Sequence, residues 1–358
     1  MNTPILALHG VAKHFIVRRS LFGVPTGVVR AVDGVSFEVR AGETMALVGE
    51  SGCGKSTVGR LALRLLEPTC GSVHFAGRDL ATLSAPELRR ARAGAQLIFQ
   101  DPYGSLNPRM RVGELLAEPL LLHADLAPAE RRERVGQLLR AVGLLPEHGR
   151  RYPHEFSGGQ RQRIAIARAL AVEPKLIVCA EPVSALDVSI RSQILNLLKD
   201  LQQRLGLAYV FISHDLAVVK HIATRVAVMY LGRIVETADC EELFAEPRHP
   251  YTQALLAAVP APSAGPRGVR RILPGDLPSP LAPPPGCHLQ PRCAHAQAIC
   301  RERAPPLSDW DAGHATACHR WRDIVSLPST PRAESAFPAN LQRLFRAFAG
   351  PPDERSGE

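Results

Sequence analysis

Residues 49–57 read GESGCGKST, and this stretch decides the fold. It fits the pattern Gly, four residues, Gly, Lys and Ser or Thr, in which backbone amides and a lysine hold phosphate groups. An apolar run at 45–48 precedes it and predicts a buried strand, and helical periodicity follows over 56–66. Because glycines permit tight turns, successive amides can converge on phosphate oxygens at the helix N-terminus. The sequence therefore predicts a nucleotide site.

Each position of this phosphate loop is a candidate nucleotide-binding residue. The candidates are Gly49, Glu50, Ser51, Gly52, Cys53, Gly54, Lys55, Ser56 and Thr57. We expect Lys55 to reach the β- and γ-phosphates and the Ser56 hydroxyl to bind Mg²⁺. The predicted cofactors are thus a nucleoside triphosphate and Mg²⁺.

The composition is that of an ordinary globular protein. The 358 residues are long enough for two or three domains, and 46% are hydrophobic and 22% charged. The sequence contains no run of about 18 apolar residues, so no membrane span is predicted. The N-terminus lacks signal-peptide features, so we expect the protein in the cytoplasm. The formal charge of +9 is compatible with nucleic acid or an anionic membrane surface. The basic residues are scattered among acidic ones, however, which is typical of a solvated face.

The first part of the chain, residues 5–48, is predicted to be rich in β-structure. Segments 6–15 and 35–39 alternate as strands do, and a basic, glycine-containing loop is expected over 18–27. Phe15 is the candidate for an aromatic side chain that stacks on an adenine ring. Packing in the core is the alternative for this residue.

Two further strands are predicted after the loop helix, at 71–75 and 95–99. Gln100 follows the second of them, and the segment 101–110, DPYGSLNPRM, is expected to be a loop. A glutamine at a strand end can bind a metal or an attacking water, and its movement can then shift the segment that follows it in the chain.

A helical subdomain is predicted at about residues 101–171, because apolar residues recur at helical spacing over 112–145. Residues 157–163, SGGQRQR, open a helix predicted over 160–170. Two glycines leave bare amides at this helix N-terminus, beside the Ser157 hydroxyl, which makes a second phosphate-binding device. One chain rarely needs two such devices for one phosphate, so a site shared between two chains is expected.

The phosphate loop followed by FSGGQRQR resembles the nucleotide-binding domain of an ATP-binding cassette (ABC) transporter, and the resemblance covers residues 5 to about 320. FQDPYGSLNPRM at 99–110, HPYT at 249–252 and a late cysteine cluster are similar to the oligopeptide, dipeptide and nickel importer family. The implied fold class is α/β. It is a P-loop NTPase cassette with a β-rich N-terminal part, an inserted helical signature subdomain and a Pro- and Cys-rich C-terminal appendage.

The resemblance implies ATP as the nucleotide and assigns catalytic roles. The catalytic candidates are Lys55, Gln100, Glu181 and His214. Glu181 follows a strand predicted at 176–179 and matches the general base that activates water. Gln100 matches the loop glutamine that senses the γ-phosphate and, with Ser56, would face Mg²⁺. His214 ends another predicted strand and matches the switch histidine, with structural packing as the alternative.

Other matching positions would contact ATP from across a dimer interface. The signature residues, which would touch ATP held on the opposite subunit, are Ser157, Gly158, Gly159 and Gln160. The loop SALD at 184–187 would cross the interface, and Asp187 is its nucleotide-binding candidate.

One position departs from the family pattern. The family's buried strand ends in Asp and then Glu, whereas this chain has Ala180 and then Glu181. The missing carboxylate would hold Mg²⁺ through water, and its loss can cost about 10 to 100-fold in metal affinity or activity. The alternative explanations for Ala180 are a degenerate site in an asymmetric pair, a weakened but working site, and a change without consequence. Retention of the other catalytic candidates favours the weakened site.

The composition changes after the predicted cassette domain at 1–258. Twelve prolines lie between Pro260 and Pro306, which predicts a linker and loop-rich appendage over 259–322. The remaining tail, 323–358, is expected to be flexible apart from one amphipathic stretch at 341–348.

The appendage contains half of the eight cysteines, namely Cys287, Cys293, Cys300 and Cys318. Disulfides are disfavoured in a cytosolic protein, so metal ligation is the natural interpretation. Four thiolates can hold a [4Fe–4S] cluster, and the family resemblance points the same way. Zinc is an alternative, although the spacings lack the two-residue knuckles common in zinc sites. Free structural thiols are the other alternative.

The expected function is that of an ATPase subunit that energises peptide import. The implied partners are two membrane permease subunits, a second ATPase subunit that is a copy or a paralogue, and an extracytoplasmic solute-binding protein. The chain would lie peripherally on the cytoplasmic face of the bacterial inner membrane. The alternatives are import of nickel or another small solute, a soluble cassette ATPase acting on nucleic acid or ribosomes, and a non-hydrolysing module. Soluble cassette ATPases typically carry two cassettes in one chain or a long coiled-coil insertion. This sequence has neither feature, so no nucleic-acid partner is expected.

Overall fold

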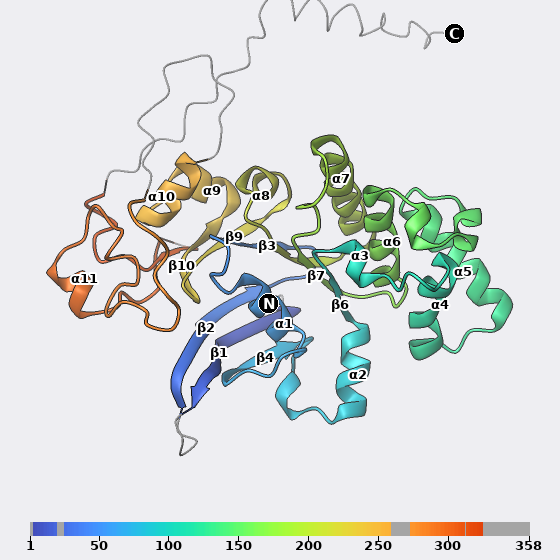
Figure 1. Ribbon diagram of the computed structural model, residues 1–358, viewed down its shortest axis with the longest axis horizontal. Coiled ribbons are helices and arrows are strands. Elements are labelled where there is room, and N and C mark those ends of the chain that lie inside the picture. The colour runs from blue at the N-terminus through green and yellow to red at the C-terminus, as the bar shows by residue number, and fades with distance from the viewer. Residues whose placement is uncertain (1–2, 20–24, 259–272, 312, 325–358) are drawn as a thin grey trace, which may run out of the picture.

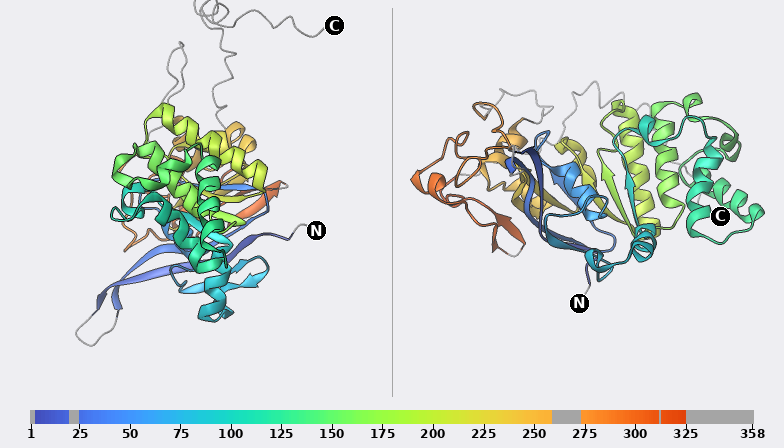
Figure 2. Two further views of the ribbon diagram at one scale, coloured as in Figure 1. Left: turned by 90° about the vertical axis from the view of Figure 1, so that its right-hand side faces the viewer. Right: turned by 60° about the horizontal axis from the view of Figure 1, so that its bottom comes forward.

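The computed structural model describes residues 3–19, 25–258, 273–311 and 313–324. Two β-sheets, one helix between them and helices on the outer face of the larger sheet make up its layers (Figure 1). The inserted helices and the C-terminal appendage lie at opposite ends of the molecule, as Figure 2 shows in its right-hand view.

The larger sheet has a parallel centre and antiparallel outer strands. Its order is β11 (Ser308–Asp311), β12 (His314–Thr316), β10 (Arg233–Asp239), β9 (Arg225–Tyr230), β3 (Thr44–Val48), β8 (Ala208–Ile212), β7 (Leu176–Ala180) and β6 (Ala95–Ile98). Strands β9, β3, β8, β7 and β6 are parallel neighbours. Every residue of β3 and β8 is buried, because helices or a second sheet cover both faces of a parallel sheet.

The smaller sheet is antiparallel, in the order β2 (Pro25–Val39), β1 (Leu6–Arg19), β4 (Cys70–Phe75) and β5 (Arg78–Asp79). The ends of the loop expected over 18–27 belong to strands, because Arg18 pairs with Gly27 and Arg19 with Pro25, whereas residues 20–24 lie outside the described residues. The two strands form a long ribbon, and Pro25 stands at a strand start, where a missing N–H is tolerated.

The helices include those predicted in the regions 56–66, 112–145 and 160–170. They are α1 (Lys55–Ala62), α2 (Ala85–Ala93), α3 (Pro102–Ser105), α4 (Val112–His123), α5 (Pro128–Ala141), α6 (Gly158–Leu170), α7 (Val188–Leu205), α8 (Leu216–Ile222), α9 (Cys240–Ala245), α10 (Pro250–Ala257) and α11 (Ala298–Glu302), with 3₁₀ turns at Leu80–Thr82, Pro146–Arg150 and Pro153–Glu155. The loop helix is shorter than the predicted 56–66, since α1 ends at Ala62.

The segment 101–110 is not entirely a loop, because α3 lies within it. The Tyr103 N–H donates to Asp101 Oδ1 at 2.8 Å, and Pro102 occupies the first helical position. An aspartate cap and a proline at the first turn are helix-start features, and they outweigh the turn-forming Gly and Asn that suggested a loop.

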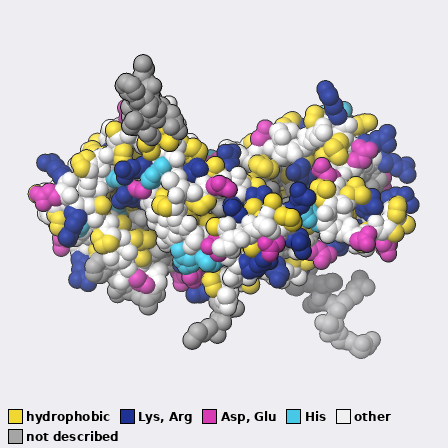
Figure 3. Space-filling view, turned by 90° about the horizontal axis from the view of Figure 1, so that it is seen from below, with side chains coloured by type: hydrophobic (Ala, Val, Ile, Leu, Met, Phe, Trp, Pro, Cys, Tyr) yellow, Lys and Arg dark blue, Asp and Glu magenta, His cyan; other side chains and the backbone are white. Residues whose placement is uncertain are grey.

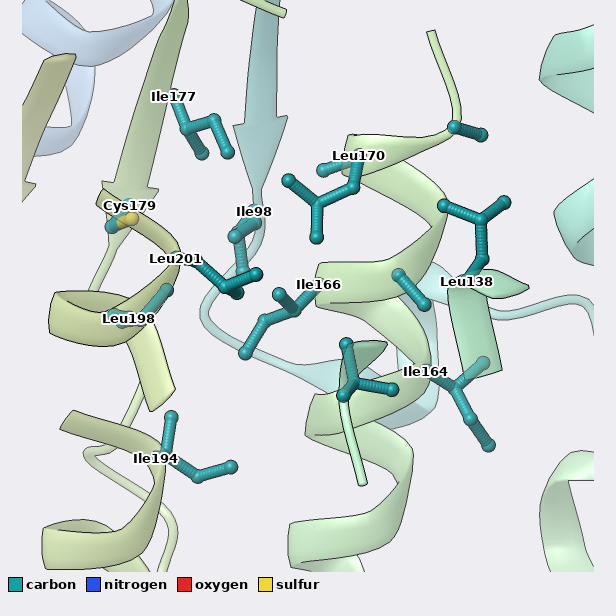
Figure 4. Packing of buried hydrophobic residues seen from close by; sticks show 14 of the residues in the cluster. Ile98, Leu138, Ile164, Ile166, Leu170, Ile177, Cys179, Ile194, Leu198 and Leu201 are labelled. Atoms are coloured by element: carbon teal, nitrogen blue, oxygen red, sulfur yellow. The ribbon is translucent and has the colours of Figure 1, made fainter. Parts of the chain in front are cut away.

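Buried apolar side chains pack on both faces of the larger sheet. Figure 4 shows one cluster, where Ile98 and Ile177 from the sheet meet Ile166 of α6 and Leu198 and Leu201 of α7. A second cluster holds α1 between the two sheets. The helix that follows the phosphate loop is thereby fixed on two sides.

The C-terminal appendage is rich in loops, as its prolines predict, and it also adds two short strands to the larger sheet. β12 pairs with β10, with Glu236 opposite Thr316, and β11 pairs with β12. His314 is fully buried there, with Nε2 2.8 Å from Glu236 Oε1 and Nδ1 2.8 Å from Glu242 Oε1. The domain limits at 258 and 322 stay predictions, and the amphipathic stretch at 341–348 lies outside the described residues.

None of the helices in the described ranges is long and apolar enough to cross a membrane. Figure 3 shows Lys and Arg side chains interspersed with Asp and Glu on the face seen from below. This distribution agrees with the solvated face that the scattered basic residues predict.

Candidate nucleotide-binding site

Four parallel strands direct their carboxyl ends to the same edge of the larger sheet. The phosphate loop follows β3, Gln100 follows β6 closely, Glu181 follows β7 and His214 follows β8. In open α/β sheets this edge is where ligands bind. The sheet therefore collects residues that lie up to 165 positions apart in the sequence, counted from 49 to 214.

Two glycines give the phosphate loop its shape. Gly49 has φ of 150° and Gly54 of 108°, both on the side of the backbone map that favours glycine. A Cβ on Gly49 would lie 2.2 Å from the Met229 carbonyl oxygen, and one on Gly54 would lie 2.1 Å from the Ala31 carbonyl oxygen. Neither position accepts a side chain, so the loop can follow this close path only with glycine.

The Lys55 ammonium group lies inside the curl of the loop. Lys55 is buried, and its Nζ donates to the carbonyl oxygens of Gly49 at 2.8 Å and Glu50 at 2.9 Å. α1 begins at Lys55 without a side-chain cap, so its first amides remain available to a phosphate. Cys53 is buried and its pKa is raised by burial, which leaves a neutral thiol facing inward and only its backbone for a ligand.

Three of the predicted catalytic residues meet at the Glu181 carboxylate. Glu181 Oε2 accepts a hydrogen bond from Gln100 Nε2 at 3.1 Å and lies 3.1 Å from His214 Nδ1. The Glu181 side chain is only 14% exposed, whereas His214 is 56% exposed. A carboxylate held between an amide and an imidazole is well placed to orient a water molecule.

The backbone of Glu181 is left-handed, with φ of 50°, which is uncommon for a residue with a side chain. The surrounding hydrogen bonds hold it there. The Glu181 N–H donates to the Ile212 carbonyl at 3.0 Å, and both the N–H and the hydroxyl of Ser184 donate to the Glu181 carbonyl. Such strain concentrates at functional sites, where the surrounding structure over-determines it.

The predicted magnesium residues line one cavity of about 260 Å³. Ser56, Gln100 and Ala180 all contribute to its wall, together with Asp101 and Arg60. Hydroxyl and amide oxygens are ligands that suit Mg²⁺, which usually keeps several waters. The residues present therefore fit the ion, and Ala180 places a methyl group where the family has a carboxylate.

The signature segment is built as a helix start. Ser157 Oγ accepts from the Gln160 N–H at 3.3 Å, and Gln160 Oε1 accepts from the Ser157 N–H at 3.0 Å, which is a capping box. Gly159 faces α7 so closely that a Cβ would lie 2.4 Å from Ile190 Cγ2. Within the described ranges no hydrogen bond joins this segment to the phosphate loop. Asp187, before α7, is exposed.

Phe15 lies on the surface of β1 with 37% of its area exposed, and Lys13 Nζ lies 5.4 Å from its ring centroid. Core packing, the alternative for this residue, is therefore wrong. Stacking on an adenine ring stays a prediction.

The structure adds contacts that the sequence did not indicate. The Arg161 guanidinium of the signature helix lies 3.8 Å from the Tyr103 ring centroid, which joins that helix to the segment after Gln100. Arg191 of α7 pairs with Asp215, the residue after His214, at 2.8 Å. Neither pair has a local sequence signal, since both depend on helix packing.

The four late cysteines line one small cavity of about 20 Å³, roughly the space of a single water. Burial raises the pKa of Cys287 to about 11 and that of Cys318 to about 12, so these thiols are protonated at neutral pH. Among the residues described, no three His, Cys, Asp or Glu side chains are arranged to hold a metal ion. The cysteines thus share a cavity, but their arrangement is not that of a formed metal site.

A phosphate loop between a buried strand and a helix, a carboxylate at the end of a parallel strand of the same sheet and a separate signature helix define an ATP-binding cassette. Residues 32–184 match the family described as ABC transporter, and residues 235–300 match the one described as oligopeptide/dipeptide transporter, C-terminal region. The chain belongs to the ATP-binding proteins of ABC transporters that carry this C-terminal region.

Curated relatives match almost their whole length. A putative peptide import ATP-binding protein of Brucella ovis is 54% identical over 319 residues, which cover 89% of this chain and 98% of the relative. The dipeptide transport ATP-binding protein DppF of Escherichia coli is 51% identical over 318 residues, 89% of this chain and 95% of that protein. The dimeric cassette MJ0796 bound to ADP and Pi has a TM-score of 0.59 at 28% identity, covering 66% of this chain and 98% of its own.

Proposed function

We propose that this chain is the ATP-hydrolysing subunit of an importer that carries dipeptides or oligopeptides across the bacterial inner membrane. The observation that carries the catalytic part is the Glu181 carboxylate, which Gln100 and His214 contact at 3.1 Å each. The names of the relatives and the C-terminal region at 235–300 support the peptide cargo.

In the proposed mechanism, the loop amides and Lys55 hold the phosphates and Glu181 orients a water molecule. The water oxygen attacks the γ-phosphorus, its proton passes to the Glu181 carboxylate, and the bond from the γ-phosphorus to the bridging oxygen breaks to leave ADP and phosphate. Mg²⁺, held by Ser56 and Gln100, would neutralise charge on the phosphate oxygens. His214 would hold the γ-phosphate from the side of β8.

The signature segment 157–160 and Asp187 would complete a second ATP site on another ATPase subunit. Within the described residues no hydrogen bond joins segment 157–160 to the phosphate loop of the same chain, which supports this arrangement. Closing and opening of the pair would drive alternating access in two permease subunits, and a solute-binding protein would deliver the cargo. In this arrangement the chain lies peripherally on the cytoplasmic face of the membrane.

The test is ATP hydrolysis by the chain reconstituted with its membrane subunits. We expect Glu181→Gln to keep ATP binding and to lose roughly 10² to 10⁴-fold in hydrolysis, as removal of a general base does. We expect a peptide, delivered by the binding protein, to stimulate the wild-type rate. Stimulation by nickel and not by peptides would assign the cargo to the alternative importer class, and unchanged hydrolysis in Glu181→Gln would contradict the catalytic assignment.

We also propose that Cys287, Cys293, Cys300 and Cys318 hold a [4Fe–4S] cluster when the chain is assembled with iron and sulfide. The cavity that all four cysteines line supports this proposal. Because the thiols must lose protons to bind metal, loading should weaken as pH falls. Iron content and a broad visible absorption band in anaerobically purified protein test the proposal, with Cys70→Ser, an exposed thiol, as the control. Zinc in place of iron, or four titratable thiols without metal, would refute it.

A further inference from the structure

Glu50, the second residue of the phosphate loop, is held by the C-terminal part of the chain. The Arg292 guanidinium donates to both Glu50 carboxylate oxygens, from Nη1 to Oε2 at 3.0 Å and from Nη2 to Oε1 at 3.2 Å. The two residues are 242 positions apart. A forked contact of this kind fixes orientation as well as charge.

The backbone of the same residue is also held. The Glu50 N–H donates to the Tyr251 hydroxyl oxygen at 2.8 Å, and the Tyr251 side chain is fully buried. The Tyr251 ring packs against that of Tyr230, with centroids 4.7 Å apart. Tyrosine, unlike phenylalanine, can accept this hydrogen bond, so the hydroxyl has a specific use in the core.

Arg292 is itself held firmly on the appendage side. It is 8% exposed, its Nε donates to the Pro274 carbonyl at 3.3 Å, and its Nη1 lies 3.5 Å from the Tyr230 hydroxyl. The Glu50 carboxylate and the Tyr230 hydroxyl raise the pKa of Arg292 and outweigh its partial burial. A buried guanidinium with this many partners is a rigid support rather than a surface ion pair.

We propose that Arg292 and Tyr251 are positioning residues of the nucleotide site, through which the C-terminal region sets the path of the phosphate loop. A glycine-rich loop has many conformations, and ATP must select the one whose amides converge. Fixing Glu50 at both its backbone and its carboxylate anchors the point where that turn starts. Arg292 directly precedes Cys293 in the chain. The segment that contacts the phosphate loop through Arg292 therefore also lines the four-cysteine cavity through Cys293. The inference rests on the proposed ATP-binding function.

The test is ATP binding and hydrolysis by the full chain assembled with its membrane subunits. We expect Arg292→Gln and Tyr251→Phe to raise the ATP concentration for half-saturation roughly tenfold, or about 1.4 kcal/mol, with a smaller change in the maximal rate. Arg292→Lys keeps the charge but loses the fork, so it should recover part of the affinity. The double variant Glu50→Gln, Arg292→Gln should bind ATP no more weakly than Arg292→Gln alone, because each of the two changes removes the same Glu50–Arg292 contact.

Matched variants separate this effect from general loss of stability. Arg301→Gln makes the same change on an exposed residue of α11, and Tyr209→Phe removes a buried hydroxyl that donates to the Leu198 carbonyl at 2.9 Å. Both controls should bind ATP as the wild type does. Wild-type affinity in Arg292→Gln and Tyr251→Phe, or additive losses in the double variant, would overturn the inference. Failure of the wild type itself to bind ATP would instead refute the proposed function.

Discussion

Replacing Ala180 with aspartate tests whether this cassette works with a weakened metal site. Ala180 is half-buried at the end of β7 and shares a cavity of about 260 Å³ with Ser56 and Gln100. A carboxyl group needs little more space than one or two waters, each of about 30 Å³, so the cavity can accept it. Arg60 lines the same cavity and would offset part of the new charge.

The expected gain follows from the position of the new carboxylate. Bound through water to Mg²⁺, it should lower the half-saturating Mg²⁺ concentration about 10 to 100-fold, equivalent to roughly 1.4 to 2.8 kcal/mol. The maximal rate at saturating Mg²⁺ should change less, since Glu181 and its two neighbours are untouched. The assay is ATP hydrolysis as a function of Mg²⁺ concentration, with the complete complex.

Ala180→Asn is the matched control, because it adds the same shape without the charge. Overlapping Mg²⁺ titrations for the wild type and Ala180→Asp would refute the reasoning, as would equal gains from Asp and Asn. Hydrolysis that appears only in Ala180→Asp would show that this chain binds ATP as a non-hydrolysing half and that its partner performs the reaction.

Three further predictions concern packing, pH and the adenine contact. Gly159→Ala should destabilise the chain by roughly 1 to 3 kcal/mol in urea unfolding, because its Cβ would clash with Ile190 at 2.4 Å, whereas Gly158→Ala, with 3.5 Å to its nearest side-chain atom, should cost much less. Burial lowers the pKa of His314, but its two glutamate partners raise that pKa overall. The stability lost in His314→Gln should therefore be largest below about pH 6.5 and should shrink as pH rises through the folded-state pKa. A loss of stability that does not depend on pH would contradict this. Phe15→Leu should weaken ATP binding by roughly 1 to 3 kcal/mol if the exposed ring stacks on adenine, and unchanged affinity would exclude stacking.

Much of the nucleotide site could be predicted because its signal is local. The loop at 49–57 has fixed spacings, so glycines, lysine and hydroxyl reach one phosphate whatever surrounds them. The buried strand β3 was recognisable as a continuous apolar run. Glu181 and His214 could be placed at strand ends, and the family resemblance supplied their roles, which stay proposals.

Errors arose where tertiary packing or pairing outweighed local composition. The basic residues near 18–27 suggested a loop, yet cross-strand pairing of Arg18 with Gly27 extends the ribbon. The prolines of the appendage predicted a loop-rich segment and gave no sign of a strand, yet residues 314–316 pair with the edge of β10 and add a strand there. Strand pairing of this kind depends on what lies alongside, which local composition does not contain.

The sequence by itself determined a phosphate-binding loop on an α/β sheet, a separate signature helix and a late group of four cysteines, because each is written in neighbouring residues. Only the tertiary structure decided that Gln100 and His214 meet at Glu181, that Phe15 is exposed, and that Arg292 reaches Glu50 across 242 positions. The physical reason is that these contacts form between segments brought together by sheet order and buried packing, which spacing along the chain does not encode.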